Sequence, residues 1–174
     1  MPTARRLPPG VLRSELWTTR ELAGGSLTAG LGQGWDAQLS LDRFGTDSGR
    51  PTGSVAYYYL SPIADITPGI SGGIVDAANA TTDGRRVYAC LTMNRSLTQT
   101  ERFGYVELTA GFEAGRRSGP MAGLKAPIAR GVSVLGEYDG FRFNAGVEGR
   151  LGGGVYARLA MRGGVGYLVI GFRS

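Results

Sequence analysis

Two glutamates, a glycine-rich motif and one cysteine are the residues whose types could support chemistry. Glu107 and Glu113 lie six positions apart, so an extended strand would separate their carboxylates by about 20 Å, too far for joint acid–base catalysis. The motif GLGQGW at 30–35 spaces its glycines like a phosphate-binding loop. No helix pattern follows it to supply the amide groups that hold a pyrophosphate, so we expect a hairpin turn.

The cysteine and the metal-binding residue types give no better candidate. Cys90 lies in the alternating run VYACLTMN, which favours a small strand residue over a reactive thiol. A single cysteine cannot form an intrachain disulfide, and the chain has no histidine for the usual zinc and iron sites. The sequence therefore predicts a protein that is not an enzyme and that uses no metal or cofactor.

Residues of opposite charge recur in the C-terminal third at spacings that suit pairing across strands. A three-residue loop at 152–154 would place Glu148 opposite Arg158, and a two-residue turn at 139–140 would place Glu137 opposite Arg142. Such pairs could cross-link the polar interior of a closed barrel. They could also face bulk water, where each ion pair would contribute well under about 1 kcal/mol. We favour the barrel interior.

The prediction of strands in this region can be tested by their register, because every turn must keep the apolar residues on the same face of the sheet. Turns at 139–140, 152–154 and 163–164 predict one apolar face and one polar face, whereas a slip of one residue would mix the two. We therefore predict an antiparallel meander. The remaining predicted partners are Tyr138 with Phe141, Gly136 with Phe143, Val134 with Ala145, Val132 with Val147, Leu151 with Val155, Val147 with Leu159, Leu159 with Leu168, Ala157 with Ile170, and Val155 with Phe172.

The two faces of this meander are the candidate functional surfaces. The residues predicted to point into a lumen are polar: Glu137, Arg142, Asn144, Glu148, Arg150, Tyr156 and Arg158. The residues predicted to meet membrane lipid or neighbouring protein subunits are apolar: Val132, Val134, Ala145, Val147, Leu151, Val155, Leu159, Met161, Leu168 and Ile170. A face that mixes Ala, Gly, Val and Leu fills a protein core poorly but can contact fluid acyl chains, which favours lipid.

Alternation with period two extends over the rest of the chain, and convincing helix signals are scarce. We predict an all-β fold, an antiparallel up-and-down meander closed into a barrel of about 12 strands, within a range of about 10 to 14. The 174 residues form a single domain, 1–174, and residues 1–10 are expected to pack on or in the barrel.

Aromatic residues fall near the predicted strand ends, as they do in the interfacial girdles of membrane barrels. These residues are Trp17, Trp35, Tyr57, Tyr59, Phe103, Tyr105, Tyr138, Phe141 and Phe172.

Net charge and hydropathy exclude two further classes. The net charge of +5 comes from scattered basic residues, so we expect no nucleic-acid partner. The sequence contains no run of 18 or more apolar residues, which a membrane-spanning helix would need.

Two segments resemble a known protein family. The opening MPTARRLPPGVLR is similar to the P-[TS]-A-R-x-L-P-x-G-x-L-R opening of the YjbH-type outer-membrane proteins, and GEYDGFRFNAGVEGRL resembles that family's recurring EYD-x-x-x-x-NxG segment. The resemblance implies a bacterial outer-membrane β-barrel associated with exopolysaccharide export, although this chain is much shorter than typical members. It also implies that Met1 is an internal methionine, that a signal peptide has been removed, and that the opening residues pack against or into the barrel: Pro2, Thr3, Ala4, Arg5, Leu7 and Pro8.

The expected function is a non-enzymatic, porin-like outer-membrane barrel with a structural or scaffolding role in the cell envelope, linked through the resemblance to polysaccharide export. Two alternatives stay open. The chain could be a secreted structural subunit that assembles with copies of itself or with other proteins, or a soluble barrel that binds a small apolar ligand. The direction of the apolar face distinguishes the soluble barrel from the other two.

Overall fold

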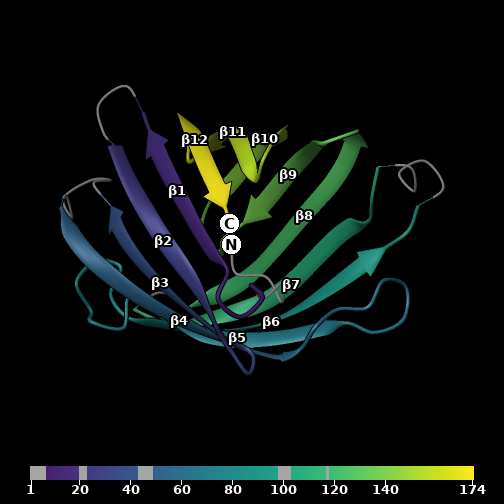
Figure 1. Cartoon of the computed structure of the whole chain (residues 1–174). Helices are drawn as coiled ribbons and strands as arrows, with labels where there is room; N and C mark the ends of the chain where they lie inside the picture. Colours follow the sequence, from purple (N-terminus) through teal and green to yellow (C-terminus); the bar gives the residue numbers. More distant parts are fainter. Residues whose placement is uncertain (1–6, 20–22, 43–48, 98–102, 117) are drawn as a thin grey trace.

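The chain folds into a closed β-barrel (Figure 1). The computed structural model describes residues 7–19, 23–42, 49–97, 103–116 and 118–174. Each strand pairs antiparallel with its neighbours in sequence, and the first strand pairs with the last to close the sheet. The predicted all-β meander of about 12 strands is therefore confirmed. The strands are β1 (Leu12–Thr18), β2 (Ala23–Gly32), β3 (Trp35–Asp42), β4 (Arg50–Leu60), β5 (Gly69–Val75), β6 (Arg86–Arg95), β7 (Val106–Gly115), β8 (Gly119–Ala129), β9 (Val132–Tyr138), β10 (Phe143–Gly152), β11 (Val155–Arg162) and β12 (Val165–Arg173).

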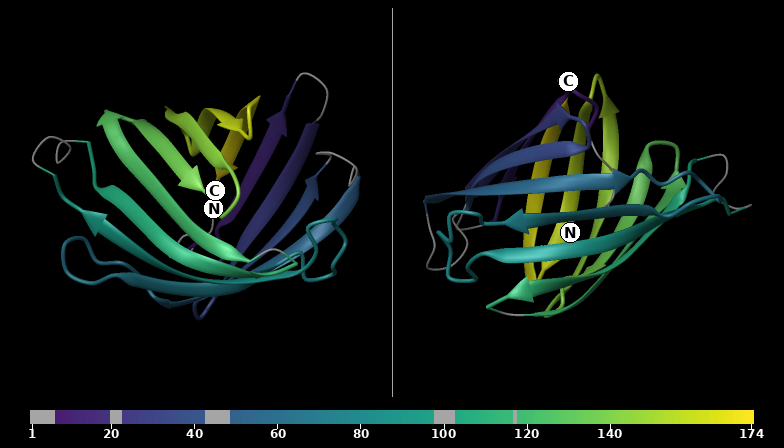
Figure 2. Two further views of the ribbon diagram at one scale, coloured as in Figure 1. Left: turned by 180° about the vertical axis from the view of Figure 1, so that it is seen from behind. Right: turned by 90° about the horizontal axis from the view of Figure 1, so that it is seen from below.

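Closure joins the two ends of the chain. The ladder between β1 and β12 runs from Arg13 opposite Arg173 to Thr18 opposite Leu168. Beyond it, the Leu12 amide donates a hydrogen bond to the Ser174 hydroxyl at 3.1 Å, and the Ser174 amide donates one to the Leu12 carbonyl at 3.1 Å. A sheet closed in this way leaves no edge strand unpaired. Figure 2 shows the wall from behind and from below.

The barrel has two rims that carry different connections. The terminal rim carries the first residues of β1 and the last residues of β12, together with the connections 33–34, 61–68, 130–131 and 153–154. The opposite rim carries the connections 76–85, 139–142 and 163–164.

Two of the three predicted hairpins have the predicted register. Glu148 lies opposite Arg158 across β10 and β11, and Leu159 lies opposite Leu168 across β11 and β12. The central residues of both turns are glycines with positive φ between 56° and 87°, a conformation that twisted two-residue hairpin turns require and that glycine adopts without strain. The other confirmed partners are Val147 with Leu159, Ala157 with Ile170, and Val155 with Phe172.

A β-bulge corrects one detail of the hairpin between β10 and β11. The register shifts between Arg150 and Gly152, so Val155 lies opposite Gly152 and the predicted pair of Leu151 with Val155 is wrong. A bulge places two residues opposite one and leaves the extra residue outside the ladder. Leu151 is that residue, and its side chain is 70% exposed.

The predicted two-residue turn at 139–140 is also wrong, because β9 and β10 are joined by the four residues 139–142. The Asp139 carboxylate accepts hydrogen bonds from the Phe141 amide at 3.1 Å and the Arg142 amide at 2.8 Å. The Tyr138 hydroxyl donates to the Gly140 carbonyl at 2.9 Å. These side-chain bonds to the backbone stabilise a wider loop than a two-residue turn.

The wider loop shifts the register between β9 and β10 by two residues. All five residue pairs predicted between β9 and β10 are therefore replaced, namely those that involved Phe141, Arg142, Phe143, Ala145 and Val147. Because the shift is even, the side chains that remain on β9 and β10 keep their predicted faces. The observed partners are Tyr138 with Phe143, Glu137 with Asn144, Gly136 with Ala145, Val134 with Val147, and Val132 with Gly149.

The first described residues pack against the inner wall formed by β2 and β3. Leu7 is 6% exposed, and its amide donates a hydrogen bond to the Asp36 carboxylate at 3.1 Å. The Gly10 amide donates to the Gly30 carbonyl at 2.9 Å, and the carbonyl oxygens of Leu7 and Pro8 lie where a side chain at Gly30 would collide with them. Residues 7–10 thus contact the barrel directly, while Pro2, Thr3, Ala4 and Arg5 lie outside the described residues.

Candidate functional site

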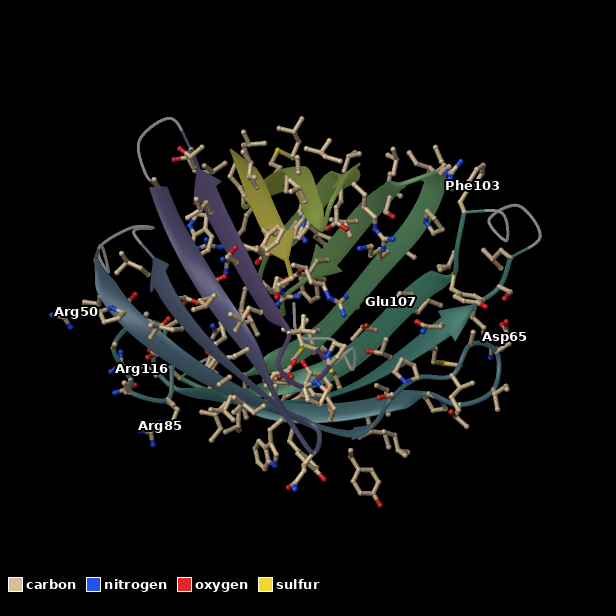
Figure 3. All side chains as sticks on the ribbon, in the orientation of Figure 1. Arg50, Asp65, Arg85, Phe103, Glu107 and Arg116 are labelled. Carbon is tan, nitrogen blue, oxygen red and sulfur yellow. The ribbon has the colours of Figure 1, made fainter. Side chains whose placement is uncertain are left out.

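The interior of the barrel is mainly polar. In the part of the chain that the structure describes, the buried hydrophobic side chains are only Leu7, Cys90, Val106, Met121 and Val169. Figure 3 shows Glu107 on the inner side of the wall. This arrangement is opposite to the one that a soluble barrel with an apolar ligand cavity requires, so that alternative is not supported. The buried polar side chains of the strands are Thr28, Asp36, Thr52, Ser71, Thr92, Glu107, Thr109, Glu113, Asn144 and Glu148.

The outward rows of the strands form an uncharged apolar belt. Large hydrophobic side chains are exposed on most of the strands. In the described strands, no Asp, Glu, Lys or Arg stands in an outward row between the first and last positions of its strand. The large members of this belt are Leu12, Leu16, Leu27, Leu31, Trp35, Leu39, Leu41, Val55, Tyr57, Ile70, Ile74, Val87, Leu91, Met93, Leu108, Phe112, Leu124, Ile128, Phe143, Val147, Leu151, Leu159, Met161, Leu168, Ile170 and Phe172.

The outward row of β6 gives the height of the apolar belt. It runs through Val87, Leu91 and Met93 and is bounded by Arg85 before the strand and Arg95 at its end. At about 3.3 Å per residue these ten steps cover roughly 33 Å along the strand, or about 25 Å along the barrel axis at a tilt of about 40°. The apolar band of membrane barrels has about the same height.

The residues that the sequence assigned to the apolar face share one face by register. Val147, Leu151, Leu159, Met161, Leu168 and Ile170 are exposed large hydrophobic residues, and Ala145 is exposed as well. Val132, Val134 and Val155 are half-buried on the same face.

Most of the residues that the sequence assigned to the lumen lie on the inner face of the barrel, whereas Arg150 and Arg142 lie at its rims. Glu148 and Asn144 are buried, and Glu137, Tyr156 and Arg158 are half-buried on the same inner face. Arg150 belongs to the same row but is exposed at the terminal rim. Arg142 is not on a strand, because the wider loop at 139–142 includes it, so its predicted position opposite Glu137 is wrong.

Glu148 is the centre of the interior charge network. One carboxylate oxygen accepts a hydrogen bond from the Lys125 ammonium group at 2.6 Å. The other oxygen accepts two from the Arg158 guanidinium, from Nη2 at 2.7 Å and Nε at 3.2 Å. This one carboxylate therefore links β8, β10 and β11 across the inner face. Charge-assisted bonds of this length are stronger than bonds between neutral groups.

A second carboxylate extends the network to the strand that closes the barrel. The Glu15 carboxylate on β1 accepts a hydrogen bond from the Tyr156 hydroxyl at 2.6 Å and lies 3.7 Å from the Arg158 guanidinium. The guanidinium carbon of Arg158 lies 5.9 Å from the centre of the Tyr156 ring. The interior charge network (Glu15, Lys125, Glu148, Tyr156 and Arg158) thus connects residues as far as 143 positions apart, Glu15 and Arg158.

Two members of this network were missed by sequence reasoning. Glu15 and Lys125 lie on strands that do not form a hairpin with β10 or with each other, so no turn in the sequence brings them together. One available signal was that Lys125 is the only lysine of the chain and lies in the alternating run MAGLKAP. Other interior contacts join Arg86 to Glu113 at 3.2 Å, Thr92 to Thr109 at 3.0 Å and Ser71 to Cys90 at 3.0 Å.

The close contact between Tyr156 and Gly171 gives a testable prediction. The Tyr156 ring occupies the space where a side chain at Gly171 would stand, and the same ring donates its hydroxyl proton to Glu15. We expect Gly171→Ala to displace the ring, weaken that hydrogen bond and lower the free energy of unfolding by about 2 kcal/mol, measured by urea denaturation. Gly166→Ala on the same strand is the control, because no atom lies within 4 Å of the added carbon. Equal stability of the two variants would contradict this packing.

The loop 76–85 at the opposite rim is organised by one carboxylate. Asp76 is 2% exposed, and its oxygens accept hydrogen bonds from the Ala80 amide, the Thr81 amide and the Thr81 hydroxyl, each at 2.8 Å. Burial opposes the charged form of Asp76, but these donors and the nearby Arg86 outweigh it and hold the pKa of the carboxyl below its usual value of 3.8.

This lowered pKa predicts a pH dependence of stability. Because the folded-state pKa of Asp76 lies below the unfolded value, its contribution is fully present above about pH 4 and is lost as the pH falls through the folded pKa. We expect Asp76→Asn to lower the thermal unfolding midpoint at pH 6, and the difference from the unmodified chain to shrink below pH 3.8. Asp83→Asn in the same loop is the control, because the Asp83 carboxylate accepts no hydrogen bond from the residues that the structure describes. A difference that stays constant from pH 6 to pH 2 would count against this assignment.

Aromatic residues lie at both rims. At the terminal rim the rings of Trp35 and Tyr57 lie 4.7 Å apart, and both side chains are exposed. At the opposite rim the rings of Tyr138 and Phe143 lie 5.0 Å apart. Of the other residues expected near the rims, Tyr59, Phe103, Tyr105, Phe141 and Phe172 are exposed.

Trp17 is the exception among these aromatic residues. Its ring occupies the space where a side chain at Gly24 would stand, and Trp17 alternates along β1 with the exposed Leu16. It therefore belongs to the inner face, and its predicted place in an interfacial girdle is wrong.

The other features considered for chemistry have structural roles. GLGQGW forms the turn between β2 and β3, where Gln33 has φ of 49° and Gly34 has φ of 86°. Among the described residues, no group of three or more His, Cys, Asp or Glu could hold a metal ion, and no helix there is long and apolar enough to cross a membrane. Neither a scan against models of known protein families nor a search of curated proteins finds a match to this chain.

Proposed function

We propose that this chain is a bacterial outer-membrane β-barrel with a structural or scaffolding role and no enzymatic activity. The observation that carries the proposal is the apolar belt, an uncharged outer surface of roughly 25 Å height around a polar interior. In water such a surface would be a large exposed apolar patch, which soluble monomers rarely have. In a bilayer the same residues contact acyl chains, and the closed ladder of hydrogen bonds pairs the strands' backbone groups with one another, which lipid cannot do.

The interior supports a structural role in preference to a wide channel. The interior charge network spans four strands and closes part of the inner space with side chains that bind one another. Such links fix strand positions relative to one another without providing a reacting group. An association with envelope polysaccharide export rests on the resemblance of the two sequence segments to YjbH-type proteins, and an envelope-complex partner is part of this proposal.

The proposal is tested by measuring what surrounds two neighbouring residues. In a Cys90→Ser background, a spin label is placed at Leu168, which is in the apolar belt, or at Tyr167, which points inward. After reconstitution in phosphatidylcholine vesicles, we expect the label at 168 to be accessible to oxygen and the label at 167 to a water-soluble nickel complex. Electron paramagnetic resonance measures both accessibilities.

Two other results would each reject the membrane proposal. If the label at 168 is accessible to the nickel complex, the apolar face meets water. If it is immobilised and inaccessible to both reagents, and the protein forms large particles that survive detergent, then other protein subunits cover the belt and the self-assembling alternative is correct.

A further inference from the structure

Two arginines stand side by side at the opposite rim, directly beyond the apolar belt. Arg85 continues the outward row of Val87, and Arg116 continues the outward row of Phe112. The Arg116 side chain crosses Gly84, since its Nε lies 3.3 Å from the place of a side-chain carbon there. The two residues are therefore neighbours in space, one just before β6 and the other just after the adjacent β7. Figure 3 shows them together with Arg50 at one end of the wall, away from Asp65 and Phe103 at the other.

Both side chains are held in place by the loop 76–85. Arg85 donates a hydrogen bond from Nε to the Ala77 carbonyl at 2.9 Å, and Arg116 donates one from Nη1 to the Thr82 carbonyl at 2.9 Å. Each guanidinium has five N–H donors, so each has four that these bonds do not use. Both residues are exposed, and their remaining donors can reach a ligand at the surface.

Two of the three carboxylates near this pair bind other groups. The Asp76 oxygens accept bonds from the loop itself, and Glu113 is paired with Arg86 on the inner face. The third, Asp83, lines a small cavity with Arg86 and Glu113 and forms no ion pair with Arg85 or Arg116. Among the described residues, neither Arg85 nor Arg116 forms an ion pair with a carboxylate. Two adjacent positive charges without a protein counterion favour an anion with several oxygen acceptors, and guanidinium groups match phosphate in geometry.

We propose that Arg85 and Arg116 bind the headgroup phosphate of an anionic phospholipid. This inference rests on the proposed membrane function. The position decides the source of the phosphate, because Val87 and Phe112 place acyl chains directly below the arginines on the same two strands. Basic residues at the level of the headgroups attract anionic lipid, and each such residue raises the affinity for that lipid roughly fivefold.

The test compares two lipids that have the same acyl chains and differ in the phosphoglycerol headgroup. The full chain in dodecyl maltoside micelles is titrated with dioleoyl phosphatidylglycerol or with dioleoylglycerol, and bound lipid is counted by native mass spectrometry. We expect preference for phosphatidylglycerol, a loss of about 25-fold in its affinity for the double variant Arg85→Ala with Arg116→Ala, and partial retention for the double lysine variant. Arg130→Ala, an exposed arginine at the terminal rim, is the matched control and should bind like the unmodified chain.

Several outcomes overturn the headgroup site. Equal binding of the two lipids, or equal loss in Arg130→Ala, shows that no site exists at Arg85 and Arg116. Inorganic phosphate that binds alone as tightly as the lipid shows that the site serves free phosphate. If the unmodified chain inserts into vesicles but shows one of these results, the headgroup site fails and the membrane function stands. If it does not insert at all, both fail.

Discussion

Glu148→Gln is expected to lower the free energy of unfolding by about 3 kcal/mol. The substitution removes the one carboxylate that binds both Lys125 at 2.6 Å and Arg158 at 2.7 Å. Two positive charges then stand in the barrel interior with one counterion fewer, and removing one partner of a buried pair typically destabilises by about 3 to 5 kcal/mol. We expect a value at the low end of this range because the Glu15 carboxylate, 3.7 Å from the Arg158 guanidinium, still compensates that charge. Urea denaturation followed by tryptophan fluorescence measures the change.

A double variant separates the lost interaction from a general effect of substitution. Lys125→Gln in the Glu148→Gln background removes the uncompensated ammonium group together with its former partner. We therefore expect the double variant to be less destabilised than the sum of the two single variants, since residues in one network are not additive. A change below about 0.5 kcal/mol for Glu148→Gln alone, the range of ordinary surface substitutions, would mean that water already screens these charges.

Leu159→Arg is expected to destabilise the barrel in a bilayer by about 2 to 4 kcal/mol, the range for arginine at the midplane of membrane barrels. Leu159 is 67% exposed in the middle of β11 and lies between Val147 and Leu168 on the neighbouring strands. An exposed leucine of a soluble protein would tolerate arginine with a change within about 0.5 kcal/mol. Urea titration of the folded fraction in phosphatidylcholine vesicles measures the difference.

Leu151→Arg supplies the matched control for position in the membrane. Leu151 is equally exposed, at 70%, but lies at the terminal rim, where arginine can reach the headgroups. We expect a destabilisation of about 0 to 1 kcal/mol there. If both leucines tolerate arginine equally well, the belt does not lie in a hydrocarbon layer.

The strands could be predicted from the sequence, and so could most of the register of the last two hairpins, between β10 and β11 and between β11 and β12. The two-residue turns at 153–154 and 163–164 have positive φ at both positions, a conformation that glycine adopts without strain. The pairs of glycines in the sequence therefore indicate where these turns lie. The turn after Tyr138 was predicted too short because Asp139 binds the amides of Phe141 and Arg142. A turn chosen by side-chain hydrogen bonds is harder to recognise than one that requires glycine.

The candidate site could be predicted only in part. Glu148 and Arg158 face each other across a single hairpin, so local spacing was enough to pair them. Lys125 and Glu15 join the same network from strands that reach Glu148 and Arg158 only after the sheet has curved into a barrel. Trp17 was placed at the membrane surface by its position near a strand end, whereas only the contact with Gly24 shows that its ring is on the inner face.

The sequence by itself determined that this chain has two faces, one apolar and one polar, because side chains alternate along a strand and that alternation is a local property of the backbone. The tertiary structure decided which face is outside. Alternation is unchanged when a sheet curves one way or the other, so the choice depends on closure between β1 and β12, at the two ends of the chain. Closure places Glu148 in the interior and Val147, its neighbour in sequence, on the outer surface.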